Sequence, residues 1–337
     1  SIVGTIPAGK VPEFVVESGT AARIMTGAPI PQGANAVVPF EETTESTFNQ
    51  LEPGKSIGIY TPGHEGSYIR PAGGDVKKGQ PVLSRNSNIH PQTIALIASM
   101  GLAHVPVYRR PEVAVLSTGD ELMEPGMEPM PGKIFDSNTL GIMASIQAAG
   151  GKPKSLGIVR DNLSDLEAKI KQAMSSDLVI TSAGVSVGDY DIVKEALARQ
   201  GVLNFWSVRM RPAKPLAFGI LNNVESDQKT PLIGLPGNPV SAFVTATLFL
   251  RPLIAKIGGA SDPRPRTVTA PLGEDLAPNG PRTDYMRAAR IDGVVHAAAI
   301  QDSSMLRTLA RADCLIVRAP HDPARTKGDS VEILPLA

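Results

Sequence analysis

The stretch DLVITSAGVSVGDYDIVKEAL (177–197) decides how the middle of this chain folds. It begins as a short apolar run typical of a buried strand and ends with the apolar spacing of a helix. The turn between them holds Gly184, Ser186, Gly188, Asp189 and Asp191. A loop that only reverses the chain does not need glycines, hydroxyls and carboxylates together. The turn therefore predicts a ligand site between a strand and a helix.

Further strands and helices alternate on both sides of this stretch. The strand-like runs are EVAVLST (112–118), PKSLGIV (153–159) and PLIGL (231–235), and the helix-like runs are SNTLGIMASIQAAGG (137–151), LSDLEAKIKQAM (163–174) and NPVSAFVTATLFLRPLIAKIGG (238–259). This alternation predicts a doubly wound α/β domain over residues 111–258, with a mostly parallel sheet covered on both faces. Ser164, with Glu167 three residues later, predicts a capping box for the helix that begins there.

The flanking segments have a different pattern. Residues 1–74 read as a β-rich N-terminal domain, incomplete at its start, in which AARIMTGAPIPQGANAVVPFEET (21–43) forms short strands joined by proline turns. Residues 75–110 read as a helical linker domain with one helix in HPQTIALIASMG (90–101). Short β runs over 259–337 predict a small C-terminal barrel or sandwich.

Composition narrows the class of function. Lys+Arg and Asp+Glu both number 33, so the net charge is zero, which argues against broad binding to nucleic acid or to an anionic membrane. The apolar run VSAFVTATLFL (240–250) is shorter than the about 20 residues that cross a bilayer, so we read it as a core helix. The single cysteine, Cys314, fits a reducing cytoplasm and reads as core filler. We expect a cytoplasmic protein that acts on small molecules.

Ligands of doubly wound folds collect beyond the carboxyl ends of the strands, so the loops expected there are the candidate site. Glu121, Asp161 and Asp191 would repel a phosphate unless Mg²⁺ lay between them. The helix start after Asn238 suits a phosphate, and the basic stretch RMRPAKP (209–215) could hold an anion. Plainer readings exist, because an aspartate such as Asp161 often only caps a helix and RPAKP could be a rigid connector.

Several long motifs resemble the MoeA/gephyrin E-domain family, the molybdopterin molybdenumtransferases. The matching stretches, in order along nearly the whole chain, are RIMTGAPIPQGANAVV, VLSTGDEL, IFDSNT, SAGVSVGDYDIVKEAL, RPAKPLAFG and GLPGNPVSA. The resemblance implies a homodimer of four-domain subunits with a MogA-like molybdopterin-binding α/β domain and a C-terminal β-barrel over 259–337. It also implies Mg²⁺-dependent transfer of molybdenum from molybdate to adenylylated molybdopterin, with release of AMP, and transient contact with the molybdopterin adenylyltransferase.

The resemblance assigns roles to individual positions. The catalytic positions it implies are Thr26, Asp75, Glu121, Asp161 and Asp191, of which Glu121, Asp161 and Asp191 would bind the metal. The positions expected to bind the substrate or cofactor are Gly184, Ser186, Gly188, Arg211, Lys214, Pro236, Gly237, Asn238, Pro239, Ser241, Arg287 and Ser303.

The chain departs from the family pattern at a few positions. Two family basic positions read Ser207 and Arg211, and the first of a family glycine pair reads Ala183. The chain starts downstream of the family's Met-Asp-Gly-Tyr-Ala motif, so we expect it to bind the pterin but to insert molybdenum poorly. Two alternatives remain open at this point: a molybdopterin adenylyltransferase, and a gephyrin-like dimeric scaffold.

Overall fold

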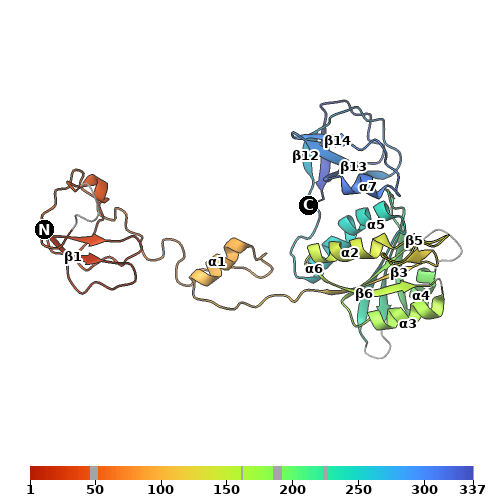
Figure 1. Cartoon of the computed structure of the whole chain (residues 1–337), viewed down its shortest axis with the longest axis horizontal. Helices are drawn as coiled ribbons and strands as arrows, with labels where there is room; N and C mark the ends of the chain where they lie inside the picture. The colour runs from red at the N-terminus through yellow and green to blue at the C-terminus, as the bar shows by residue number, and fades with distance from the viewer. Residues whose placement is uncertain (46–51, 161, 185–191, 223–226, 337) are drawn as a thin grey trace. The chain divides into compact units, whose positions relative to one another are not determined.

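A computed structural model of the chain describes residues 1–45, 52–160, 162–184, 192–222 and 227–336 (Figure 1). The chain forms two compact units, residues 1–84 and residues 85–337. The four domain boundaries expected from the sequence are a finer division than this and stay a prediction.

The N-terminal unit is built mainly from loops around one pair of strands. Strand β1 (Ile2–Ile6) pairs in parallel with β2 (Ala21–Ile24), and a short 3-10 helix covers Phe40–Glu42. The prediction of several short strands over 21–43 is wrong beyond Ile24, because the following residues form turns. Prolines in this stretch lack the N–H that a strand ladder needs, and Gly27 and Gly33 adopt φ values of 84° and 87° that reverse the chain.

The second unit starts with a helix and then builds the predicted α/β sheet. Helix α1 (Pro91–Ser99) confirms the helix expected in 90–101, and Gly101 follows it with φ 78°. The sheet has the order β6–β3–β7–β11–β10–β8, and its first four strands are parallel. These strands are β3 (Glu112–Thr118), β6 (Lys152–Val159), β7 (Leu178–Ser182), β8 (Gly201–Ser207), β10 (Pro215–Asn222) and β11 (Lys229–Leu235).

The edge of the sheet differs from a purely parallel arrangement. Strand β10 runs antiparallel to β11, and β8 runs antiparallel to β10. A strand's local pattern reports burial but carries no information on direction, so the sequence did not indicate this antiparallel edge.

Helices cover both faces of the sheet, as predicted (Figure 1). Helices α2 (Ser137–Ala148), α5 (Pro239–Thr245) and α6 (Arg251–Ile257) pack on one face, and α3 (Leu163–Ala173) and α4 (Ile192–Gln200) pack on the other. A π-helical stretch, Ala246–Leu250, joins α5 to α6. The resulting run Pro239–Ile257 is long and apolar enough to cross a membrane by length and composition. Its buried residues, including Ala242, Leu250 and Ile254, pack into the core of the sheet, as expected of a core helix.

The capping box predicted for Ser164 and Glu167 is wrong, as the start of α3 shows. The helix begins at Leu163, and its N-cap is Asn162, whose side chain accepts a hydrogen bond from the backbone N–H of Ser164 at 2.9 Å. Ser164 therefore lies inside the helix, and Glu167 forms an ion pair with Arg199 instead. Asn162 has extended backbone dihedrals, which the N-cap position requires, and Asn and Ser are similarly good caps, so the sequence could not decide between them.

The C-terminal part forms a sheet that curls toward closure. Its order is β12–β16–β15–β13–β14, and the edge strands β12 and β14 meet through a bridge between Leu272 and Val295. A short strand from the α/β part, β9 (Met210–Arg211), pairs with β13 and joins the two parts. The elements are β12 (Val268–Pro271), β13 (Thr283–Ile291), β14 (Val294–Ala297), α7 (Leu306–Ala310), β15 (Cys314–Arg318) and β16 (Ser330–Pro335).

Candidate functional site

The loops that follow β3, β6, β7 and β11 start at the same edge of the sheet. Thr118 pairs with Val159, and Ser182 pairs with both Ser117 and Leu235. Because these strands are parallel, their carboxyl ends meet there, and the prediction that four polar loops share one edge is confirmed for the loop starts. Asp161, Ser186, Gly188, Asp189 and Asp191 lie outside the described residues.

The first residues of the β7 loop approach their neighbours closely. Ala183 and Gly184 both have positive φ values, 70° and 69°, and a Cβ on Gly184 would lie 2.8 Å from Thr118 Oγ1. Glycine is thus needed at position 184 by both backbone and space. Gly237, from the loop after β11, comes near the same turn, since a Cβ on it would lie 3.2 Å from the Cβ of Ala183. The predicted residues Gly184 and Gly237 are therefore brought together.

The start of α2 forms the floor under these two loops. The buried Asp136 caps the helix by accepting hydrogen bonds from the backbone N–H of Thr139 at 3.0 Å and from its Oγ1 at 2.6 Å. Asn138 is also buried, and its Nδ2 donates to Ser182 Oγ at 2.9 Å and to the Gly237 carbonyl at 2.8 Å. Sequence reasoning used IFDSNT for the family resemblance but did not assign Asn138 a role. A polar run before a helix reads only as a cap.

The loop after β11 is held by the C-terminal part of the chain. Asn238 is the N-cap of α5, but its side chain does not cap the helix and donates instead to Ser303 Oγ at 3.1 Å. The backbone N–H of Val240 donates to the Ser303 carbonyl at 3.1 Å. One of the amide groups that a phosphate could use is therefore already bonded. Pro236 and Pro239 lie on either side of this contact, and Ser241 is buried behind it.

Arg287 supports the same contact from inside the C-terminal sheet. Arg287 is 1% exposed, and its guanidinium donates to the carbonyls of Asp302 at 2.9 Å and Ile300 at 3.2 Å. Burial lowers the pKa of Arg287. In this arrangement Arg287 fixes the segment that carries Ser303. Both positions, which the family resemblance singled out, therefore help to hold the loop after β11 in place.

The basic stretch lies where β9 joins β13. Arg211 forms an ion pair with the buried carboxylate of Asp284, and its Nε–Oδ2 distance is 3.0 Å. This hydrogen bond raises the pKa of Arg211. Arg209 donates to the Pro281 carbonyl at 3.2 Å, and the side chain of Lys214 is exposed.

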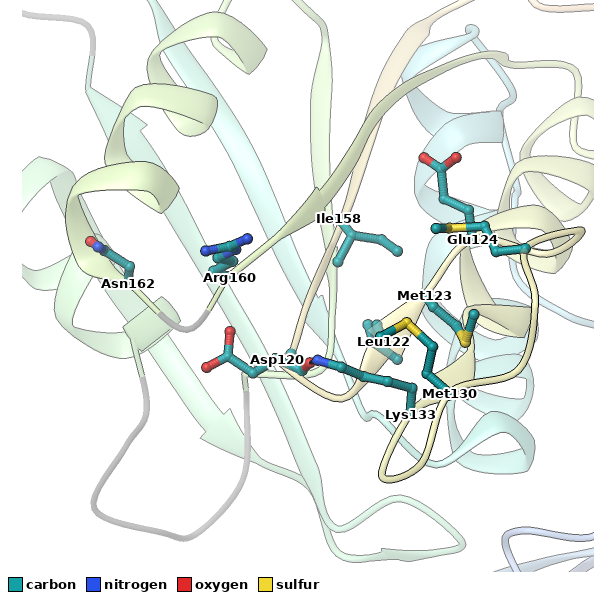
Figure 2. A pocket seen from close by; sticks show the side chains of 11 residues that line it. Asp120, Leu122, Met123, Glu124, Met130, Lys133, Ile158, Arg160 and Asn162 are labelled. Carbon is teal, nitrogen blue, oxygen red and sulfur yellow. Dashed lines mark hydrogen bonds between the residues drawn. The ribbon is translucent and has the colours of Figure 1, made fainter.

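A cavity of about 840 Å³ opens at the ends of β3 and β6, beside Asp120 (Figure 2). The segment between β4 (Leu122–Met123) and β5 (Ile134–Phe135) forms one wall, and Arg160 lies on the opposite side. Lys133 crosses the floor and donates to the carbonyl of Asp120. The cavity thus combines methionine and aliphatic side chains with two cations and with the carboxylates of Asp120 and Glu124. Its lining residues include Leu122, Met123, Met127, Met130, Lys133, Ile158 and Arg160.

The predicted metal and N-terminal positions are only partly covered by the structure. The carboxylate of Glu121 lies against Gly119, where a Cβ would come within 2.5 Å of its Oε2. Among the described residues, no three Asp, Glu, His or Cys side chains gather closely enough to hold a metal ion. The set Glu121, Asp161 and Asp191 therefore stays a prediction. Thr26 and Asp75 are exposed residues of the N-terminal unit.

Comparison with known proteins gives matches along the whole chain. Residues 1–101 match the family model described as "MoeA N-terminal region (domain I and II)", residues 114–256 match "Probable molybdopterin binding domain", and residues 269–336 match "MoeA C-terminal region (domain IV)". A molybdopterin molybdenumtransferase of Haemophilus influenzae is 35% identical over 99% of this chain and 82% of its own length. Molybdopterin molybdenumtransferase 2 of Mycobacterium tuberculosis is 35% identical over 92% of this chain and 76% of its own.

Solved structures give the same picture. The molybdopterin biosynthesis MoeA protein of Pyrococcus horikoshii is 26% identical, with a TM-score of 0.81 over 99% of this chain and 80% of that one.

Proposed function

Because the chain belongs to the MoeA family of molybdopterin molybdenumtransferases, we propose that it transfers molybdenum from molybdate to molybdopterin. The observation that carries the proposal is the match of three consecutive family regions to the three parts of one chain. The loops of the α/β part that share one edge of the sheet supply the site.

The substrate that we propose is adenylylated molybdopterin, with AMP as the released product. The glycine loops after β7 and β11 lie close together, because Gly184 packs against Thr118 and Gly237 packs against Ala183, where a Cβ would meet protein atoms. The pterin would therefore meet two adjacent loops at this edge of the sheet. Lys214 and Arg211 supply positive charge for an oxyanion such as molybdate. No side-chain nucleophile is required, so the chain's main contribution is to hold two substrates in a reactive geometry.

We propose Mg²⁺ as a cofactor, with Glu121, Asp161 and Asp191 as the residues that would hold it. When bound, such an ion offsets the charge of a phosphate that accepts a nucleophile. Among these three residues the structure describes Glu121 alone, and its carboxylate lies against Gly119, which follows the carboxyl end of β3 and lines the cavity. The proposal is tested by the Mg²⁺ dependence of AMP release.

The assembly and location that we propose follow the family. They are a homodimer in the cytoplasm that acts on small molecules and meets the molybdopterin adenylyltransferase transiently. Light scattering at micromolar concentration tests the dimer, and a fully active monomer would contradict it. The family matches over residues 1–101 and 269–336 favour the transferase over a stand-alone adenylyltransferase, which would need only the α/β part.

The deciding experiment is incubation of the chain with adenylylated molybdopterin, Mg²⁺ and molybdate. We expect AMP release that depends on molybdate, and a pterin product that activates a molybdenum enzyme lacking its cofactor. The reaction with ATP and unmodified molybdopterin should give no adenylylated product. Formation of adenylylated molybdopterin and pyrophosphate from ATP, or no molybdate-dependent release of AMP at all, would overturn the proposal.

A further inference from the structure

Asn138 joins two loops that are far apart in the sequence. One N–H of its side-chain amide donates to Ser182 Oγ, at the end of β7, and the other donates to the carbonyl of Gly237, after β11. A carbonyl oxygen can only accept, so the atom that faces Gly237 must be the amide nitrogen, and the orientation of the side chain is fixed. The side chain therefore uses both donors to tie Ser182 to Gly237, next to the ladder bond that the N–H of Ala183 donates to the Leu235 carbonyl at 3.1 Å.

The surroundings of Asn138 hold it in place. Its exposed fraction is 7%, and its backbone belongs to the first turn of α2, which the buried carboxylate of Asp136 caps. Thr139, the residue that binds Asp136, also bonds to Ser117 of β3 at 2.7 Å, so the helix start is tied to the sheet. The backbone of Asn138 is therefore held at a fixed position relative to the sheet.

The amide oxygen of Asn138 is buried without a hydrogen-bond partner among the residues that the structure describes. A buried polar atom left unpaired is costly, so a purely structural bridge would be better served by a group with no extra acceptor. An asparagine at position 138 is explained if both N–H groups of its side-chain amide are required as donors. A hydroxyl has one donor, and an aspartate at neutral pH has none.

We propose that Asn138 is a positioning residue for the transfer reaction, which sets the spacing of the loops after β7 and β11 on either side of the substrate. This role rests on the proposed function and goes beyond it, because Asn138 itself need not touch the substrate. A shift of about 1 Å between groups that position reactants can reduce a rate on the order of a hundredfold. Loss of the bridge should therefore lower the rate of the transfer step more than the affinity for molybdate.

Three variants test this. In Asn138→Asp the shape is kept, but the carboxylate meets the Gly237 carbonyl without a proton, and we expect kcat at pH 8 to fall about 10- to 100-fold. The KM for molybdate should change less than about threefold, the range left when the oxyanion contacts are untouched. Asn138→Ala should lose kcat similarly. The control Asn204→Asp makes the same chemical change at an exposed position of β8 and should behave as wild type.

The pH profile separates positioning from a general structural defect. Burial and the facing carbonyl disfavour the charged form of the introduced carboxyl, so its pKa should be raised. Once protonated, the carboxyl has one O–H that can donate to Gly237, and its other oxygen can accept from the Ser182 hydroxyl. The activity of Asn138→Asp relative to wild type should therefore rise as the pH falls from 8 to 6, whereas that of Asn138→Ala should not. Parallel profiles for both variants would overturn the proposal.

A measurement without substrate keeps the inference separate from the proposed function. Hydrogen exchange should become faster in Asn138→Ala in both loop segments, 182–184 and 237–240, and remain unchanged in Asn204→Asp. If wild type transfers no molybdenum, the proposed function fails, and faster exchange would still show the bridge. If wild type is active and Asn138→Asp has wild-type kcat, positioning by Asn138 is refuted. Should Asn138→Asp not fold, Ser182→Ala removes one of the two bonds, and a wild-type kcat for it would equally refute the proposal.

Discussion

Replacement of Arg287 decides between two roles for a residue that the family resemblance marks as functional. In the structure the guanidinium is buried in the C-terminal sheet and bonded to the carbonyls of Ile300 and Asp302. A residue that binds the substrate oxyanion would need an accessible guanidinium. We therefore expect Arg287→Met, which keeps the aliphatic volume, to act first on stability.

The size of the effect follows from the contacts. Loss of the guanidinium leaves two carbonyls without their donor, and each such buried group costs about 1–3 kcal/mol. The gain from removing a desolvated charge, whose Nε has no partner among the described residues, offsets part of this cost. A net loss of about 2–4 kcal/mol remains. For a folded unit of this size, 1 kcal/mol shifts Tm by about 2–4 °C, so we expect a decrease of roughly 10 °C.

The assay is thermal unfolding combined with molybdate binding measured well below the transition. Arg290→Met, on the same strand, is the matched control, because its exposed ion pair with Asp313 contributes about 1 kcal/mol or less. We expect Arg287→Met to unfold early but to bind molybdate within about threefold of wild type while it is folded. An unchanged Tm together with lost molybdate binding would refute the structural role and favour direct contact.

Three further changes test the packing, the electrostatics and the metal site. Gly141→Ala should lower Tm, because the new Cβ would lie 2.0 Å from Phe243 Cζ and overpacking costs about 1–3 kcal/mol; an unchanged Tm would show that the ring turns aside. Asp177→Asn should lower Tm at pH 7, because the hydrogen bond from Arg109 lowers the pKa of Asp177 and its stabilisation is present above the unfolded-state pKa. This difference should shrink as the pH falls below about 4 through the lowered pKa, and a constant difference would contradict the assignment. Glu121→Gln should keep the fold but require more Mg²⁺ for half-maximal AMP release, and an unchanged Mg²⁺ titration would remove Glu121 from the metal site.

The sequence predicts the α/β part well because its signals are local. The run 112–118 was predicted as a strand and forms β3 over Glu112–Thr118, since a short continuous apolar run can be satisfied only by burial on both faces. The direction of β10, which is antiparallel to β11 and to β8, was missed because a strand's direction is set by the connection that precedes it. The N-terminal stretch 21–43 was overestimated as β structure, because its apolar residues alternate with prolines that cannot join a ladder.

The place of the site was more predictable than the role of each residue in it. Parallel strands bring their carboxyl ends to one edge whatever the side chains, so the loops after β3, β7 and β11 were found from the order of elements alone. Asn138 was missed because its role depends on two acceptors about 44 and 99 residues away in the chain. Two such partners meet only in the folded molecule, and nothing in the local pattern of a helix start indicates them.

The cations show why residue type alone overstates the charge that a site offers. Four basic residues were considered as anion ligands from the sequence, but Arg287 is buried against carbonyls, Arg211 is paired with Asp284, and Arg209 bonds to a backbone carbonyl. Each guanidinium joins the α/β part to the C-terminal part or supports a loop near that seam. Arg211 keeps exposed N–H groups beyond its pair, so it can serve both purposes, whereas the side chain of Arg287 is buried against the carbonyls of Ile300 and Asp302. Lys214 is exposed and has no ion pair in the described part of the chain, so it is the cation of this stretch whose charge is most available to a substrate oxyanion.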